Sequence, residues 1–193
     1  MLEPIIQLDR KIFYYVNDQW SSPVMDWLAP FLREPYTWAP LYLFLALFAL
    51  INFRLRGLWW CMFFIITFAI SDQTSLFLKG AVGRLRPCHD AAVAFFMHQR
   101  VPYCPSSGSF TSNHASNHFA LALFCFVTLW PYFGRYNWLF FVWAAAVSYS
   151  QVYVGVHYPF DVLAGGILGA GIGWLTSTVF NRRIGLIQEP AVA

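Results

Sequence analysis

Five stretches of this sequence are long and apolar enough to cross a lipid bilayer as helices, and they constrain the fold more than any other feature. A spanning helix needs roughly 20 mostly apolar residues. The chain is 59% hydrophobic and only 11% charged, whereas soluble domains contain roughly 25% charged residues. We therefore expect an all-α, polytopic membrane helix bundle of about five transmembrane helices, over residues 37–53, 58–78, 115–133, 138–156 and 162–180.

The N-terminal residues differ from these spans because apolar and polar side chains alternate in them at helical spacing. Residues 3–20 place apolar side chains such as Ile5 and Ile12 on one side and charged ones on the other, which is typical of a helix lying in the membrane interface. A second short helix is expected over 24–32, after the break at Pro23. We interpret both as rim helices that stabilise the bundle. No cleavable signal peptide is recognisable ahead of them.

The chain is expected to form a single domain over residues 1–193. Within it we expect interfacial helices at 1–35, the transmembrane bundle at 36–180, and a cytoplasmic tail at 181–193. The loop over 79–113 contains several glycines and prolines, so it cannot be one regular helix. Loops of this length are usually functional or disordered.

Arginines gather in the connections on one side of the expected bundle: Arg54, Arg56, Arg135, Arg182 and Arg183. Positively charged short loops mark the cytoplasmic side of a membrane protein. The N-terminus and the loop 79–113 then lie on the exoplasmic side. That side also carries cations, which weaken the charge asymmetry and need an explanation of their own: Lys79, Arg84 and Arg86.

The four cysteines fall into two groups. Cys61 and Cys125 lie inside spans and are expected to be small apolar fillers. Cys88 and Cys104 lie in the exoplasmic loop, where disulfides persist. We predict that these two form a disulfide, which would stabilise the fold by about 3 kcal/mol in the chain-entropy description.

The first of three polar blocks is Lys79-x6-Arg86-Pro87, at the end of the second span. A guanidinium offers a planar pair of donors to phosphate oxygens, and a lysine offers a mobile point charge. Pro87 restricts the backbone of Arg86, which holds the arginine at the head of the loop. The alternative is a set of interfacial cations that extend toward lipid headgroups.

The second block, Ser112-Asn113-His114, comes directly before the third span. Ser112 suits a helix N-cap, and the N-terminus of a helix binds anions through its free backbone N–H groups. His114 could serve as a general acid, since an unperturbed histidine has a pKa of about 6.5. The alternative is a capped helix with an incidental histidine.

In the third block, His157 and Asp161 stand four residues apart, with Pro159 between them. On a helix both side chains would share one face, and Pro159 suits its first turn. A carboxylate bonded to one imidazole nitrogen fixes the tautomer and makes the other nitrogen more nucleophilic. The alternative is a structural pair that closes a turn. All three blocks fall on the same side of the membrane, and together they predict phosphoryl transfer through a histidine.

The blocks resemble the three motifs of the type 2 phosphatidic acid phosphatase superfamily, which includes the vanadium haloperoxidases: Lys-x6-Arg-Pro, Pro-Ser-Gly-His and Ser-Arg-x5-His-x3-Asp. The resemblance covers about two-fifths of the chain and implies the membrane lipid phosphatase branch, which uses no metal or other cofactor. It implies that His157 is the nucleophile, that Asp161 orients it, and that His114 protonates the leaving oxygen. It also implies that the phosphate is held by Lys79, Arg86, Ser112, the backbone at Asn113, and Arg84 as an additional cation.

Two positions depart from the family pattern. Asn113 stands where the family has glycine, and a left-handed backbone would suit asparagine less well. Gln151 stands where the family has arginine, and glutamine supplies no charge to a transition state that is stabilised mainly by electrostatics. We expect an active but atypical phosphatase in which Gln151 still contacts phosphate or Arg84 compensates for the missing charge.

The resemblance points to a lipid phosphate or diphosphate as the substrate. The classes it suggests are undecaprenyl diphosphate, phosphatidylglycerophosphate, phosphatidic acid and lipid A phosphates. The expected setting is a bacterial inner membrane, with the active site on the periplasmic, exoplasmic face. The sequence indicates neither a nucleic acid nor a protein partner. A small soluble substrate stays open, as does transfer of the phosphoryl group to another lipid instead of water.

Two other functions remain open from the residues themselves. His114 and His118, with His157 and Asp161, could imitate a zinc site, although the nearby cations would repel a dication. With Gln151 in place of arginine, the protein could instead bind or carry a phospholipid without cleaving it. A structural role is expected for His118, and an interhelical hydrogen bond is expected for Asp72.

Overall fold

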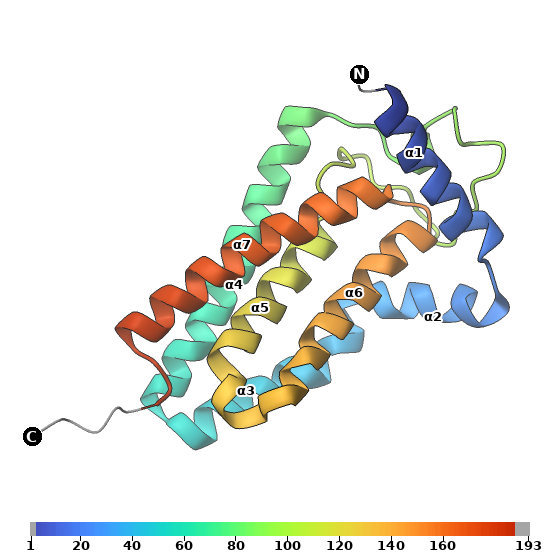
Figure 1. Ribbon diagram of the computed structural model, residues 1–193. Helices are drawn as coiled ribbons and strands as arrows, with labels where there is room; N and C mark the ends of the chain where they lie inside the picture. The colour runs from blue at the N-terminus through green and yellow to red at the C-terminus, as the bar shows by residue number, and fades with distance from the viewer. Residues whose placement is uncertain (1–2, 188–193) are drawn as a thin grey trace, which may run out of the picture.

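The structure is a computed structural model that describes residues 3–187, and every regular element in this part is helical (Figure 1). This confirms the predicted all-α class. The longer helices are α1 (Glu3–Tyr14), α2 (Pro23–Arg33), α3 (Ala39–Phe53), α4 (Leu55–Val82), α5 (Asn113–Phe133), α6 (Trp138–Tyr153) and α7 (Pro159–Arg183). Short helical turns are η1 (Tyr15–Gln19), η2 (Pro35–Trp38), η3 (Pro87–His89) and η4 (Gly134–Asn137).

Within residues 3–187, four continuous helical segments are long and apolar enough to cross a membrane: Pro35–Phe53, Leu55–His89, Asn113–Tyr153 and Pro159–Arg183. The third is 41 residues long and contains both α5 and α6, which fold back on each other at η4 (Figure 1). The bundle is thus built from α3 to α7. Large apolar side chains are exposed on its outer surface, as a lipid environment requires, among them Ile51, Ile65, Phe77, Val142 and Ile167. The protein is an integral membrane protein.

Helix α5 lies at the centre of the bundle, where it packs against α4, α6 and α7. Glycines recur at every fourth position where α7 meets α5, and a Cβ atom on Gly169 would overlap the carbonyl oxygen of Ser116. Small residues of this kind let two helix backbones approach closely. The close crossing also brings the beginnings of the two helices together, because Ser112 N donates to Asp161 O at 3.0 Å. The second and third polar blocks therefore meet.

The long loop and the N-terminal helix α1 lie at one end of the bundle (Figure 1). The α3–α4 connection, η4 and the C-terminal end of α7, which carry the arginine-rich segments, lie at the opposite end (Figure 1). This is the separation of polar blocks and arginines that the sequence predicts. Part of the expected tail, residues 188–193, lies outside the described residues.

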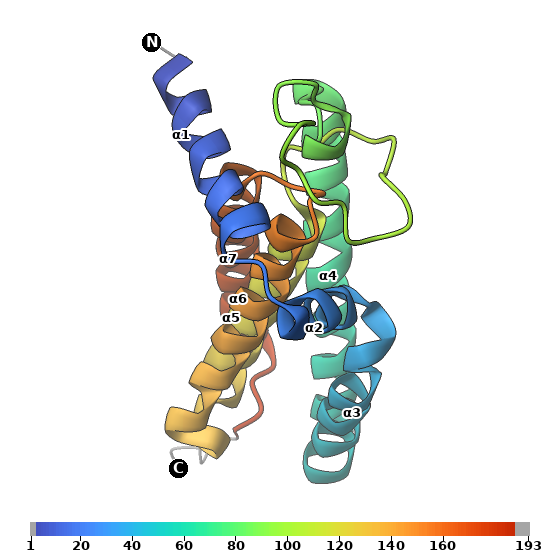
Figure 2. The same ribbon diagram turned by 90° about the vertical axis from the view of Figure 1, so that its right-hand side faces the viewer.

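The N-terminal helices tie the long loop to the bundle. The expected helix over 3–20 consists of α1 followed by the π-helical turn η1. Arg10 pairs with Asp90 of the loop at 2.9 Å. Asn17 donates to the backbone oxygens of His98 and Tyr153, at 2.9 and 2.8 Å. Helix α2 packs against α6 and leads into α3, which lies beside α4 (Figure 2). These helices therefore hold the loop as well as covering the rim.

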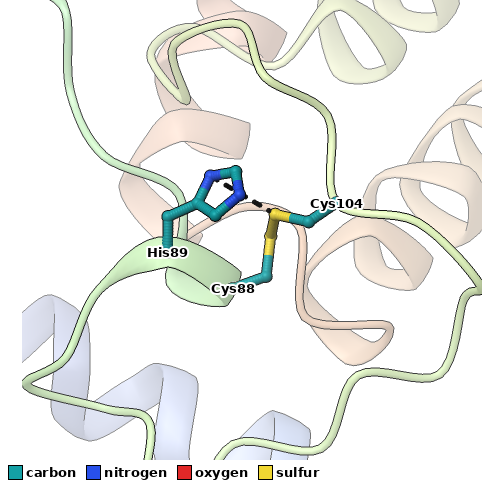
Figure 3. A group of neighbouring side chains, drawn as sticks. All are labelled: Cys88, His89 and Cys104. Atoms are coloured by element: carbon teal, nitrogen blue, oxygen red, sulfur yellow. Dashed lines mark hydrogen bonds between the residues drawn. A yellow bond between two sulfur atoms is a disulfide. The ribbon is translucent and has the colours of Figure 1, made fainter.

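The long loop begins at Gly83, one turn later than expected, because α4 continues past Lys79 to Val82. Gly83 ends the helix with a φ of 62°, in the left-handed region that favours glycine. Cys88 and Cys104 form the predicted disulfide within the loop (Figure 3). The imidazole of His89 lies beside it, with Nδ1 3.5 Å from Cys104 Sγ (Figure 3).

Candidate active site

Two buried cations converge from the end of α4 and the start of the loop. The ammonium group of Lys79 donates to the backbone oxygens of Ser109 and Thr111. Arg86 is held by Ser107 O at 2.9 Å from its Nε and by Val156 O at 3.0 Å from its Nη1. Both side chains are only 5% exposed. Backbone carbonyls therefore fix the two positive charges without neutralising them.

The second polar block forms the start of α5. Ser112 is the N-cap, and its Oγ accepts from Ala115 N at 3.4 Å, as predicted. Asn113 Nδ2 donates to Asp72 Oδ1 of α4 at 2.7 Å, and Asn117 Nδ2 donates to the same oxygen at 3.0 Å. The predicted interhelical hydrogen bond of Asp72 is therefore confirmed. It fixes α5 against α4 close to the buried cations.

His157 lies in the turn between α6 and α7, close to Asp161 but not on a helix with it. Its Nδ1 is 3.7 Å from Asp161 Oδ2, which is too long for a direct hydrogen bond. Ser109 stands between the two: its Oγ donates to Asp161 Oδ2 and lies 3.4 Å from His157 Nδ1. Asp161 Oδ2 also accepts from Tyr158 N at 2.9 Å. The carboxylate thus acts on the imidazole through Ser109, a residue that the sequence patterns did not single out.

Burial determines the protonation of His157. Its pKa falls to about 4, mainly because burial disfavours the charged imidazolium, with Arg86 and Lys79 adding to the effect and Asp161 opposing it. Nδ1 faces Ser109 and Asp161, while Nε2 accepts from Arg86 Nη1 at 3.1 Å. At neutral pH the imidazole is therefore uncharged, and the lone pair of Nε2 is directed toward a cation. An uncharged imidazole keeps a lone pair on Nε2, and the cation beside that nitrogen would attract an anionic group.

Arg84 has a different position from the one expected for a phosphate ligand. Its Nη1 lies 2.6 Å from Asp161 Oδ1 and its Nη2 lies 2.5 Å from Asp9 Oδ2. Asp9 belongs to α1 and also accepts from Phe160 N at 2.9 Å. Both ends of the guanidinium are therefore engaged by carboxylates. Arg84 positions Asp161 and joins α1 to the site.

A cavity of about 300 Å³ lies among these side chains. Six of the predicted site residues line it: Lys79, Arg86, Asn113, His114, Gln151 and His157. Ser112, Arg84 and Asp161 support the cavity from outside its lining. Arg33 at the end of α2 also lines it, although no motif in the sequence indicates this. Positive charge, a neutral imidazole and a second histidine therefore face one space.

An apolar cavity of about 410 Å³ adjoins this space. Arg33, Asn113 and His114 line both cavities, which makes them neighbours. The walls of the second cavity include Tyr42 of α3, Phe68 and two other apolar side chains of α4, and Leu121 of α5. A phosphate held at His157 would thus have room beside it for an apolar group.

Residues 58–185 match the family model described as the PAP2 superfamily. The chain belongs to this superfamily. It is 30% identical to the lipid A 4'-phosphatase of Bacteroides thetaiotaomicron, over 98% of this chain and 84% of that protein. It is also 30% identical to an undecaprenyl-diphosphatase of Sulfolobus acidocaldarius, over 86% of this chain and 74% of that protein. The fold resembles the crystal structure of the transmembrane PAP2-type phosphatidylglycerolphosphate phosphatase from Bacillus subtilis, with a TM-score of 0.74, 19% identity, and 93% and 88% of the two chains covered.

PAP2 membership confirms the resemblance that the three polar blocks predicted, and it makes the protein a membrane lipid phosphatase. The two departures from the PAP2 motifs have different consequences here. Asn113 is the first residue of α5 and has helical backbone angles, so this position does not require a glycine. Gln151 is completely buried and lines the cavity. It therefore leaves one site of a PAP2 motif without its positive charge.

The alternative of a zinc site finds no support in the geometry. In the described part of the chain, Cys88, His89 and Cys104 place their ligand atoms within 4.8 Å of one another, but the two sulfurs are bonded to each other (Figure 3). His118 donates from Nδ1 to His114 O at 2.8 Å and packs its ring against Trp143. This is the structural role expected for His118. The cations beside His114 and His157 would also repel a dication.

Proposed function

We propose that this protein hydrolyses the phosphomonoester or diphosphate of a membrane lipid through a phosphohistidine on His157. The observation that carries the proposal is the shared cavity, where the neutral imidazole of His157 faces two fixed cations and His114. A neutral nucleophile, positive charge for the phosphate and a second histidine for proton transfer are the groups that metal-free phosphoryl transfer requires.

The reaction proceeds in two steps. Nε2 of His157 attacks phosphorus, the bond from phosphorus to the lipid oxygen breaks with its electron pair on that oxygen, and His114 donates a proton to it. Water then attacks the phosphohistidine, His114 takes a proton from the water, and the phosphorus–nitrogen bond breaks with its electron pair returning to His157. Lys79 and Arg86 stabilise negative charge on the non-bridging oxygens in both steps.

The neighbouring apolar cavity supports a lipid as the substrate. His114 lines both cavities, so the leaving oxygen lies where the phosphate meets the apolar part of the molecule. The similarity to a lipid A 4'-phosphatase over 98% of this chain makes a lipid A phosphomonoester the first substrate to test. Undecaprenyl diphosphate is the second, because another relative is named for it.

The proposed location is the inner membrane of a bacterium, with the site on the exoplasmic face. The arginine-bearing connections lie at the end of the bundle away from the site (Figure 1), and the loop at the site contains a disulfide. Disulfides persist outside the cytoplasm. After mild reduction of intact cells, a membrane-impermeant thiol reagent should label Cys88 or Cys104. Labelling that required cell lysis would place the site on the cytoplasmic face.

The catalytic proposal is tested by phosphate release from purified protein in detergent with a chelator present. The panel contains lipid A, undecaprenyl diphosphate, phosphatidylglycerophosphate and phosphatidic acid, and His157→Ala is the control. We expect turnover that the variant lacks and a phosphorylated intermediate that is stable to base. Lipid binding without turnover by the folded wild type would indicate a phospholipid carrier.

A further inference from the structure

Arg33 is a buried cation that forms no salt bridge within the described part of the chain. It is the last residue of α2 and is only 5% exposed. Among the described residues 3–187, its Nε and Nη1 are buried and have no hydrogen-bond partner. Burying a charged group without a partner is costly. Its presence here points to an anion that binds beside it.

The guanidinium of Arg33 lies at the cavity of His157. Arg33 lines this cavity together with Lys79, Arg86 and His157. The ring of Tyr103, which lines the same cavity, has its centroid 5.7 Å from the Arg33 guanidinium carbon. An aromatic ring at this distance attracts the cation. The ring therefore helps to hold the guanidinium in place while leaving donors free.

Gln151 cannot supply what an arginine at its position would supply. Its amide nitrogen is engaged within its own helix, 3.4 Å from both Val147 O and Ser150 Oγ. Its Oε1 is buried and has no partner among the described residues, and an oxygen repels a phosphate. Arg84 cannot replace the missing charge, since Asp9 and Asp161 engage both of its terminal nitrogens.

We propose that Arg33 is a phosphate-binding residue of the active site and supplies the positive charge that Gln151 lacks. This inference rests on the proposed function. The free donors of Arg33 bind non-bridging oxygens of the substrate phosphate together with Lys79 and Arg86, because all three cations line the same cavity. The charge comes from α2, whereas Gln151, which stands where the family has arginine, lies on α6. The rim helix is thereby part of the active site.

The kinetic test compares Arg33→Met with the wild type on the lipid that the protein hydrolyses. Methionine keeps an unbranched side chain without charge or donors, and we expect kcat/KM to fall about 100-fold, as when one donor to a developing charge is removed. Arg135→Met, at the opposite end of the bundle, is the matched control and should stay within twofold of the wild type. The double variant Arg33→Met/Gln151→Arg should have a kcat/KM at least tenfold higher than that of Arg33→Met. Arg33→Met activity within threefold of the wild type would overturn the inference, as would a loss that Gln151→Arg leaves uncorrected.

Binding of orthovanadate to the same proteins separates this inference from the proposed function. We expect its Kd to rise at least tenfold in Arg33→Met, with an unchanged melting temperature in detergent. If Arg33→Met does not fold, Arg33→Lys should fold and show a smaller change in the same direction. No lipid turnover by the wild type, together with Arg33-dependent vanadate binding, would refute the hydrolase and keep Arg33 as a phosphate ligand. Normal turnover and vanadate binding in the folded Arg33 variants would refute the role of Arg33 alone.

Discussion

Ser109 links the imidazole of His157 to the carboxylate of Asp161. We predict that Ser109→Ala lowers kcat roughly tenfold, because outer partners that orient a reacting group are typically worth about 10- to 100-fold. KM should change little, since the cations that hold the phosphate stay in place. Steady-state kinetics measures both constants. The exposed Ser106 provides the matched control, Ser106→Ala. Equal kcat values for the two variants would show that His157 does not depend on Ser109 as its link to Asp161.

The protonation of His157 gives a second prediction at this scale. Its pKa of about 4 lies below the value of about 6.5 in an unfolded chain. Between these values the unfolded state binds more protons, so the free energy of unfolding falls as the pH drops through this range. Activity through the neutral imidazole falls when the pH approaches 4. An NMR titration of histidine-labelled protein should include a resonance with a midpoint near pH 4 that is missing from His157→Gln. A midpoint near 6.5 would contradict the prediction.

The residues of the three motifs could be predicted because their spacing along the chain is distinctive. Ser109 and Arg33 could not, since each belongs to a segment with no recognisable pattern and reaches the site only through the tertiary fold. Arg84 shows the converse. Its place inside the first motif suggested a phosphate ligand. Its partner Asp9 is far from it in the sequence, on α1, so no local pattern predicts their ion pair.

At the crossing of α5 and α7 the two helix backbones approach each other closely at Gly165, Gly169 and Gly173. We predict that Gly169→Ala lowers the free energy of unfolding by about 1–3 kcal/mol, since the added methyl group overlaps the Ser116 carbonyl and forces the helices apart. Gly171→Ala is the control on the same helix, where a Cβ meets nothing within 4 Å. It should be neutral or stabilising, because alanine favours helix more than glycine does.

Thermal unfolding in detergent measures both glycine variants. Equal melting temperatures for Gly169→Ala and Gly171→Ala would mean that α5 and α7 can separate without cost. Activity should fall with the melting temperature in Gly169→Ala, because the same crossing aligns Ser112 with Asp161.

Most helix positions followed from apolar length and from local start and stop signals. Ser112 caps α5 and Pro159 begins α7, as their residue types indicated. The end of α4 was misplaced because Gly80 and Gly83 are both possible terminators, and only the backbone angle at Gly83 shows which of them ends the helix. The docking of α1 and α2 depends on single polar contacts such as Asn17 with the loop, which periodicity cannot show.

For the molecule as a whole, the loop at the site is fastened at several points, one of them covalent. We predict that Cys88→Ser/Cys104→Ser lowers the free energy of unfolding by about 3 kcal/mol, the value expected for a closed loop of roughly this length. Thermal unfolding without reductant measures the difference. Reductant should destabilise the wild type and leave the double variant unchanged. Equal stability of the two proteins without reductant would show that the N-terminal helices alone hold the loop.

The neighbouring cavities carry a consequence for small-molecule inhibitors. The apolar cavity beside the phosphate site is lined by residues of α3, α4 and α5, and Ile65, which is 65% exposed on α4, is one of them. An inhibitor that fills this cavity would arrive by lateral diffusion within the lipid. Its potency should then follow its partition coefficient, so two compounds with equal affinity for the isolated protein can differ in cells according to how strongly each concentrates in the bilayer.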